Sequence, residues 1–192
     1  MKIEVRLSGS GGQGVVLAAI ILAEAAGLHD GRNVVQTQSY GVEARGGASR
    51  AEVIISDEEI VFPEVIRPDV LLAMNQPSMN RYANSVKENG ILIADSSLVK
   101  EIPGVRAKIF SLPLTELGRQ AGGVIVSNMV ALGSLLGLSG VASVESVRKA
   151  VLNRVPKGTE EMNVRALELG LQAGTQALFP PSEAEAGVGP GE

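Results

Sequence analysis

The stretch Gly9-Ser10-Gly11-Gly12-Gln13-Gly14 has the spacing G-x-G-x-x-G and stands between two segments of different periodicity. Residues 3–7 before it alternate apolar with charged or polar side chains, which predicts a strand. Residues 15–26 after it are rich in alanine, leucine and isoleucine and stop at Gly27, which predicts a helix. A glycine-rich turn between strand and helix leaves backbone N–H groups at the helix start able to bind an anion. The stretch therefore predicts an α/β fold with an anion site after its first strand.

Outward from this loop, segments with strand and helix periodicity continue to alternate. We expect strands at 33–39, 49–56, 70–74, 90–94 and 106–112, and helices at 77–88, 114–120, 123–138, 144–155 and 160–178. Parallel strands need crossover connections, which the intervening helices can supply. The expected fold is α/β and Rossmann-like, a mainly parallel sheet flanked by helices with a helical C-terminal part.

The length of 192 residues fits one domain. We expect this domain to occupy residues 1–179. Residues 180–192 are rich in proline, glycine, alanine and glutamate and have little to bury, so they are predicted to form a disordered tail.

The composition limits the chemistry that the chain can perform. A net charge of -4 argues against a general affinity for nucleic acid. Without cysteine, the chain cannot form disulfides, ligate an iron-sulfur cluster or use a thiol nucleophile. The single histidine, His29, offers neither a metal-binding pair nor a triad, and it is predicted to lie at the surface. No metal ligand and no catalytic residue is expected in this chain.

Residues 120–144 form the longest uncharged stretch and resemble a membrane span at first sight. The stretch contains Asn128, several serines and several glycines, so a buried or subunit-facing helix is the better interpretation. The N-terminal apolar run carries charges and does not resemble a signal peptide. We expect a cytoplasmic protein with no membrane partner.

Two nucleotide-binding motifs fit the first loop poorly. No lysine followed by serine or threonine closes it, so it is not a Walker loop. A dinucleotide fold needs an acidic residue near the end of the second strand, but Gln36-Thr37-Gln38-Ser39 stands there and Asp30 precedes the strand. The loop either contacts a ligand or a partner surface, or its glycines only allow strand and helix to pack closely.

A second glycine-rich loop runs from Tyr40 to Gly47. Arg45 stands between an alanine and two glycines, and its guanidinium could form a bidentate contact with a phosphate from there. Pairing with Glu43 or with a partner chain is the alternative. Tyr40 could touch a ligand or pack in the core or an interface.

Two asparagines complete the candidate residues. Asn75 follows the strand at 70–74, at the carboxyl edge where open α/β sheets place their ligands. Asn128 interrupts an apolar helix, which indicates first a helix cap or a helix–helix contact and only second a functional role.

Four blocks, in order, resemble the gamma subunit of 2-oxoacid:ferredoxin oxidoreductases. They are Gly9-Ser10-Gly11-Gly12-Gln13-Gly14-Val15-Val16-Leu17-Ala18, Gln38-Ser39-Tyr40-Gly41-Val42-Glu43-Ala44-Arg45-Gly46-Gly47, Asn75-Gln76-Pro77 and Asn128-Met129-Val130-Ala131-Leu132-Gly133. Val42 departs from the family pattern, which would have proline there. Residues 27–35 and 56–60 look closest to relatives that act on 2-oxoglutarate.

The resemblance implies a complex that oxidatively decarboxylates a 2-oxoacid, transfers the acyl group to coenzyme A and passes electrons to ferredoxin. Thiamine diphosphate, Mg and iron-sulfur clusters would belong to partner subunits, namely alpha, beta and, where present, a ferredoxin-like delta subunit. The alternatives are a stand-alone nucleotide-binding oxidoreductase and a non-catalytic assembly module. The residues expected to contact a cofactor such as coenzyme A are Gly9, Ser10, Gly11, Gly12, Gln13, Gly14, Tyr40, Gly41, Glu43, Arg45, Gly46, Gly47, Asn75 and Asn128.

Overall fold

The computed structural model describes residues 1–39 and 48–179, so the second glycine loop and the tail lie outside it. The strands within these ranges are β1 (Lys2–Ser10), β2 (Asn33–Ser39), β3 (Ala48–Ser56), β4 (Val70–Ala73), β5 (Ile91–Asp95) and β6 (Lys108–Leu112). The α-helices are α1 (Val15–Glu24), α2 (Gln76–Tyr82), α3 (Leu114–Ala121), α4 (Ser127–Ser139), α5 (Val144–Arg154) and α6 (Glu160–Leu178). A π-helical turn η1 (Ala25–His29) and two 3-10 turns, η2 (Ala83–Ser85) and η3 (Val124–Val126), lie between them.

The strands form one sheet in the order β2-β3-β1-β4-β5-β6. Strands β1, β4, β5 and β6 run parallel, whereas β3 is antiparallel to both β1 and β2. The α/β class is confirmed. The sheet is mixed, so the expectation of a mainly parallel, Rossmann-like sheet is not confirmed. The reason is the short connection between β2 and β3. Residues 40–47 are too few for the helical crossover that parallel neighbours need, whereas antiparallel strands can be joined without a crossover.

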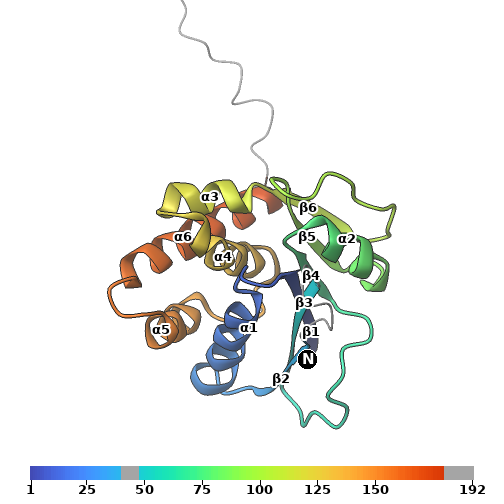
Figure 1. Ribbon diagram of the computed structural model, residues 1–192. Coiled ribbons are helices and arrows are strands. Elements are labelled where there is room, and N and C mark those ends of the chain that lie inside the picture. The colour runs from blue at the N-terminus through green and yellow to red at the C-terminus, as the bar shows by residue number, and fades with distance from the viewer. Residues whose placement is uncertain (40–47, 180–192) are drawn as a thin grey trace, which may run out of the picture.

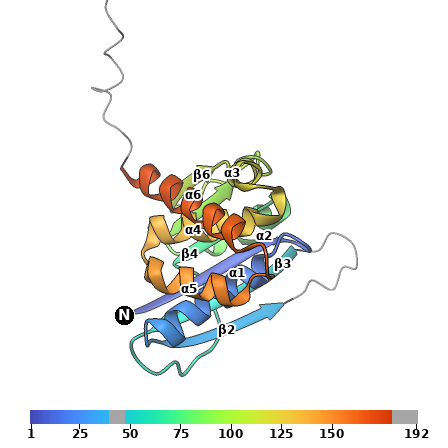
Figure 2. The same cartoon turned by 90° about the vertical axis from the view of Figure 1, so that its left-hand side faces the viewer.

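Helices cover both faces of the sheet. Helices α1, α4, α5 and α6 lie on one face and α2 lies on the other (Figures 1 and 2). The larger core packs Leu7, Val53 and Leu72 of the sheet against apolar residues of the first group of helices. A smaller core packs Met79 and other apolar residues of α2 and η2 against the opposite face of β4 and β5. The glycine loop after β1 therefore opens at the edge where the main helical layer meets the sheet.

Helix α4 is buried along almost its whole length, which confirms the buried helix expected for the uncharged stretch. Its Gly133 and Gly137 face α6, and Gly170 and Gly174 of α6 face α4. A Cβ on Gly170 would overlap the carbonyl of Val130, whose Cα would lie only 2.9 Å away. The two backbones therefore approach so closely that only glycine fits between them.

No single helix among the described residues has both the length and the apolar composition of a membrane span. By those two criteria alone, α3 and the Val124–Ser139 segment could qualify together, as a pair bent by 120°.

The predicted elements are confirmed, and the clearest differences at their ends concern two helices. Helix α1 ends at Glu24 and passes into η1, which contains Gly27. Helix α2 ends at Tyr82 instead of 88, and the hydroxyl of Ser85 donates to the Tyr82 carbonyl at 2.7 Å. This bond binds a carbonyl at the helix end, where the chain tightens into η2. His29, at the end of η1, is exposed as expected.

Candidate functional site

The first glycine loop turns sharply between β1 and α1. Strand β1 runs on through Gly9 and Ser10, and Gly14 is the residue that precedes the first turn of α1. Gly12 has a φ of 87° and Gly14 a φ of 72°. Side chains with a Cβ rarely adopt this left-handed backbone, so glycine is required at these two positions.

The side chain of Gln13 ties the loop to the end of β4. Its Oε1 accepts a hydrogen bond from the N–H of Ser10 at 2.6 Å, and its Nε2 donates to the carbonyl of Met74 at 3.2 Å. A Cβ on Gly9 would lie 2.7 Å from the Gln13 Oε1, which explains the glycine there. Gln13 therefore fixes the loop against the end of β4.

Asn75 joins the same network at the carboxyl end of β4. Its Oδ1 accepts from the N–H of Ser78 at 2.9 Å, so it caps the start of α2. Its Nδ2 donates to the Gln13 Oε1 at 3.4 Å. The structure thus confirms the position of Asn75 at the carboxyl edge and adds its link to the glycine loop.

Asn128 approaches the loop from the other side. It lies in the first turn of α4, is 5% exposed, and donates from its Nδ2 to the carbonyl of Gly14 at 3.2 Å. A Cβ on Gly14 would lie 2.9 Å from the Asn128 Cγ, so the missing side chain makes room for the amide. Asn128 thus joins the first turn of α4 to the residue that opens α1, which agrees with the expected contact between helices. Its Oδ1 accepts a hydrogen bond from the N–H of Met129 at 3.0 Å.

The start of α1 offers backbone donors. The N–H of Ala18 bonds to the Gly14 carbonyl at 3.1 Å, but the described residues supply no acceptor for the N–H groups of Val15, Val16 and Leu17. A hollow of about 260 Å³ lies beside them, lined by Ser10, Gly11, Gly12, Gly14, Val15, Val16 and Ser49. These lining residues are uncharged, and the helix dipole together with the N–H groups of residues 15–17 favours an anion at such a helix start.

The second loop reaches β3 close to the first. Ala48, where β3 begins, pairs with Ser10 in the sheet. The six candidate residues of the second loop lie outside the described residues: Tyr40, Gly41, Glu43, Arg45, Gly46 and Gly47. Their contribution to the site therefore stays a prediction.

A second arginine near this loop in sequence belongs to a different cluster. Arg50 lies on the α2 side of the sheet, 3.7 Å from the Glu52 carboxylate and 6.0 Å from the ring centre of Tyr82. Glu52 also pairs with the buried Arg6 at 2.7 Å. This charged cluster holds the sheet face together and takes no part in the glycine-loop hollow.

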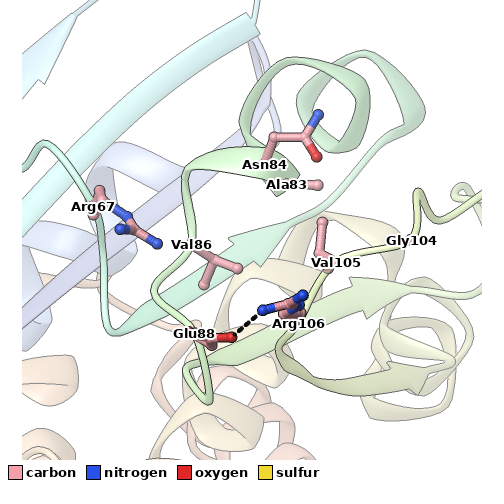
Figure 3. Close-up of a pocket in the computed structure, with 8 residues that line it drawn as sticks. All are labelled: Arg67, Ala83, Asn84, Val86, Glu88, Gly104, Val105 and Arg106. Carbon is pink, nitrogen blue, oxygen red and sulfur yellow. Dashed lines mark hydrogen bonds and ion pairs between the residues drawn. The ribbon is translucent and has the colours of Figure 1, made fainter.

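The opposite edge of the parallel strands carries another hollow, of about 300 Å³ (Figure 3). Arg67 precedes β4 and Arg106 precedes β6, so this hollow lies at the amino ends of the strands. Arg106 pairs with Glu88 at 2.9 Å across it. Among the residues that the structure describes, no group of three or more histidine, aspartate or glutamate side chains could hold a metal ion.

Fold and site define an α/β domain with a glycine-rich loop at a helix start. The model of the family described as pyruvate ferredoxin/flavodoxin oxidoreductase matches residues 4–173, and the chain belongs to this family. This confirms the resemblance carried by the four sequence blocks.

Individual relatives agree with this assignment. The chain is 47% identical over 175 residues to the 2-oxoglutarate synthase subunit KorC of Methanocaldococcus jannaschii, covering 90% of this chain and 94% of the relative. It is 43% identical to the solved gamma subunit of a keto/oxoacid ferredoxin oxidoreductase from Geobacter sulfurreducens PCA, with a TM-score of 0.82 over 90% of this chain and 98% of that one. The 2-oxoglutarate:ferredoxin oxidoreductase of Magnetococcus marinus shares the fold at 20% identity and a TM-score of 0.81, over 90% of this chain and 31% of that one.

Proposed function

We propose that this chain is the gamma-type subunit of a 2-oxoglutarate:ferredoxin oxidoreductase. The complex would oxidatively decarboxylate 2-oxoglutarate, transfer the acyl group to coenzyme A and pass the electrons to ferredoxin. The near full-length similarity to a 2-oxoglutarate synthase subunit supports this substrate over pyruvate and branched-chain 2-oxoacids.

Within that complex, the glycine loop binds a phosphate of coenzyme A. The observation that carries this proposal is the set of N–H groups at the start of α1 for which the described residues supply no acceptor, beside a hollow lined by uncharged residues. Gln13 and Asn128 hold the loop that precedes these groups. Such a helix start binds a phosphate by backbone donors and by its dipole together. The Magnetococcus enzyme, which shares the fold, was solved with 2-oxoglutarate, coenzyme A and succinyl-CoA bound.

Arg45 of the second loop would add a charge-assisted hydrogen bond to the same ligand. The pairing of Ala48 with Ser10 supports this, because it brings the entrance of β3 beside the first loop. An ion pair of Arg45 with Glu43 or with a partner chain is the alternative.

Electron transfer falls to other chains. A sequence without cysteine offers no thiolate for an iron-sulfur cluster, so the clusters belong to partner chains. The family resemblance implies that thiamine diphosphate and Mg also belong to partners, namely the alpha, beta and, where present, delta subunits. The chain also presents apolar side chains for such partners. In the loop between β3 and β4, Val61 is 88% and Ile66 is 67% exposed, and exposed apolar groups that gather on one segment are typical of interfaces.

Reconstitution tests this function. The partner subunits mixed with this chain should reduce ferredoxin when both 2-oxoglutarate and coenzyme A are present, and omission of the chain should abolish turnover. If the partners alone sustain full turnover, the chain is an assembly module. If the isolated chain binds NADH at micromolar concentration, it is a stand-alone nucleotide-binding oxidoreductase.

A further inference from the structure

The loop between β3 and β4 is long and has no helix or strand of its own. It runs over residues 57–69 and lies on the side of the sheet opposite α1 (Figure 1). The N–H of Glu58 donates to the hydroxyl of Ser56 at 3.0 Å. Further along, the Nη2 of the buried Arg6 donates to the carbonyl of Val65 at 2.5 Å. Long surface loops that are held in one shape by such bonds are commonly functional.

The outer side of this loop is both acidic and apolar. Within residues 58–66, Val61 is 88%, Phe62 is 52% and Ile66 is 67% exposed. The exposed carboxylates of the same stretch form no ion pair within the described ranges 1–39 and 48–179, and they belong to Glu58, Glu59 and Glu64. The stretch contains no lysine or arginine, and Arg67, which follows it, lines the hollow of Figure 3 instead. The loop therefore presents negative charge and apolar area together.

A hollow of about 380 Å³ lies between this loop and the edge strand β2. Its lining residues are Thr37, Gln38, Arg50, Glu52 and residues 63–65. The Glu52 carboxylate is already shared by Arg6 at 2.7 Å and Arg50 at 3.7 Å. The other carboxylate at the hollow is that of Glu64, which has no cationic partner in the described part of the chain. A cationic side chain that entered the hollow would therefore pair with Glu64.

We propose that residues 58–66 bind a basic, apolar surface of a partner subunit, and that a lysine or arginine of this partner enters the hollow beside Glu64. The inference rests on the proposed function, in which the chain is one subunit of a complex, and adds the chemistry of the partner surface. Exposed apolar groups gain from burial in such a contact, and complementary charges set its orientation and its rate of formation. A second copy of this chain fits poorly, because a two-fold contact through this loop would bring its carboxylates together.

Glu64 and Glu101 provide matched variants for a binding experiment. Both are exposed glutamates without an ion pair among the described residues, so lysine makes the same change of charge at either position. The measurement is the Kd of the full chain, followed by fluorescence anisotropy, for the remaining subunits of the complex. Glu64→Lys should raise this Kd about tenfold, and Glu101→Lys should leave it unchanged. The Kd of the parent chain should rise with salt, and that of Glu64→Lys should rise less.

Val61→Ser tests the apolar part of the same contact. Its control is Leu28→Ser, because Leu28 is 77% exposed and lies in η1 instead of the loop. Val61→Ser should raise the Kd about threefold, since less apolar area is removed from water, and Leu28→Ser should not change it. Circular dichroism of each variant checks that the fold is retained.

Three results would overturn the inference. If the parent chain binds the other subunits, but its Kd depends neither on salt nor on Glu64→Lys, a different surface makes the contact and the proposed function stands. If the chain alone forms a dimer in sedimentation and Val61→Ser abolishes it, the loop binds a second copy. If the parent chain does not bind the other subunits at all, the proposed function fails together with the inference.

Discussion

The side-chain amide of Asn128 donates to the carbonyl of Gly14 at 3.2 Å, across 114 residues of sequence. This single bond connects the first turn of α4 to the residue that opens α1. Together with the bond from Gln13 to Met74, it fixes the glycine loop between the helical layer and the sheet. A loop held at both ends keeps its N–H groups aimed at one point, which lowers the cost of ordering it around a ligand.

Asn128→Asp should destabilise the chain. The variant loses the N–H donor and places a buried carboxylate against the Gly14 carbonyl, which costs about 1 to 3 kcal/mol. Urea unfolding at pH 7 measures the loss. Asn84→Asp is the control, because Asn84 is exposed and makes no side-chain hydrogen bond with the described residues. Equal stability of the two variants would show that the bond to Gly14 contributes nothing.

Alanine substitutions along the loop should form a graded series. Gly11→Ala should be nearly neutral, since its φ lies outside the left-handed range and its Cβ meets nothing within 4 Å. Gly12→Ala has open space but a φ of 87°, so strain alone should cost about 1 to 2 kcal/mol. Gly14→Ala should cost most, because strain and overlap with Asn128 combine. Thermal unfolding ranks the three, and a different order would contradict the loop geometry.

Gly170→Ala should damage the packing of α4 against α6. The added methyl overlaps the Val130 carbonyl, and a backbone cannot move aside as a flexible side chain can. Overpacking of this kind typically costs about 1 to 3 kcal/mol or more. Gly104→Ala serves as the control, because its Cβ meets nothing within 4 Å. Far-ultraviolet circular dichroism during urea unfolding compares them, and matching midpoints would mean that the helices can separate freely.

Asp30 should make the stability of the chain depend on pH. Burial raises the pKa of Asp30. Hydrogen bonds from Ser146 and Ser143 and the charge of Arg32 together lower this pKa by more than burial raises it, so the pKa lies below its usual value. A depressed folded-state pKa stabilises the fold above the unfolded-state pKa of about 3.9, and this stability is lost as pH falls through the folded-state value. Asp30→Asn should therefore lower stability at pH 7 and progressively less below about pH 4.

Unfolding midpoints between pH 7 and pH 3 test the role of Asp30. The control is Glu101→Gln, since Glu101 is exposed and forms no ion pair within residues 1–39 and 48–179. A constant difference between Asp30→Asn and the parent chain over this range would contradict the assignment.

Local patterns were sufficient to predict the elements and the position of the glycine loop. The strand before Gly9 and the helix after Gly14 follow from periodicity, and Asn75 falls at the carboxyl edge because it follows a buried strand. The direction of β3 did not follow, because the prediction relied on the overall alternation of strands and helices. The short connection at 40–47, with no helical pattern, was the signal for an antiparallel return.

Contacts between distant segments could not be predicted. Nothing in the sequence pairs Asn128 with Gly14, because the bond depends on how α4 crosses the start of α1. The bond from Gln13 to the Met74 carbonyl could not be predicted for the same reason, because it depends on how the loop lies against the end of β4. The close packing of α4 and α6 did have a signal, since Gly133 and Gly137, like Gly170 and Gly174, recur at a spacing of four that places them on one helix face.

The most direct test of the central claim, that the glycine loop binds a phosphate of coenzyme A, is the kinetics of the assembled complex carrying Gly11→Asp. Gly11 lines the anion hollow and has room for a side chain without strain, so the new carboxylate repels a phosphate there without distorting the loop. Gly11→Asn is the uncharged control of the same size. The account predicts a rise of about tenfold in the KM for coenzyme A with aspartate, a much smaller rise with asparagine, and an unchanged KM for 2-oxoglutarate. An unchanged KM for coenzyme A, or equal effects of the two variants, would contradict it.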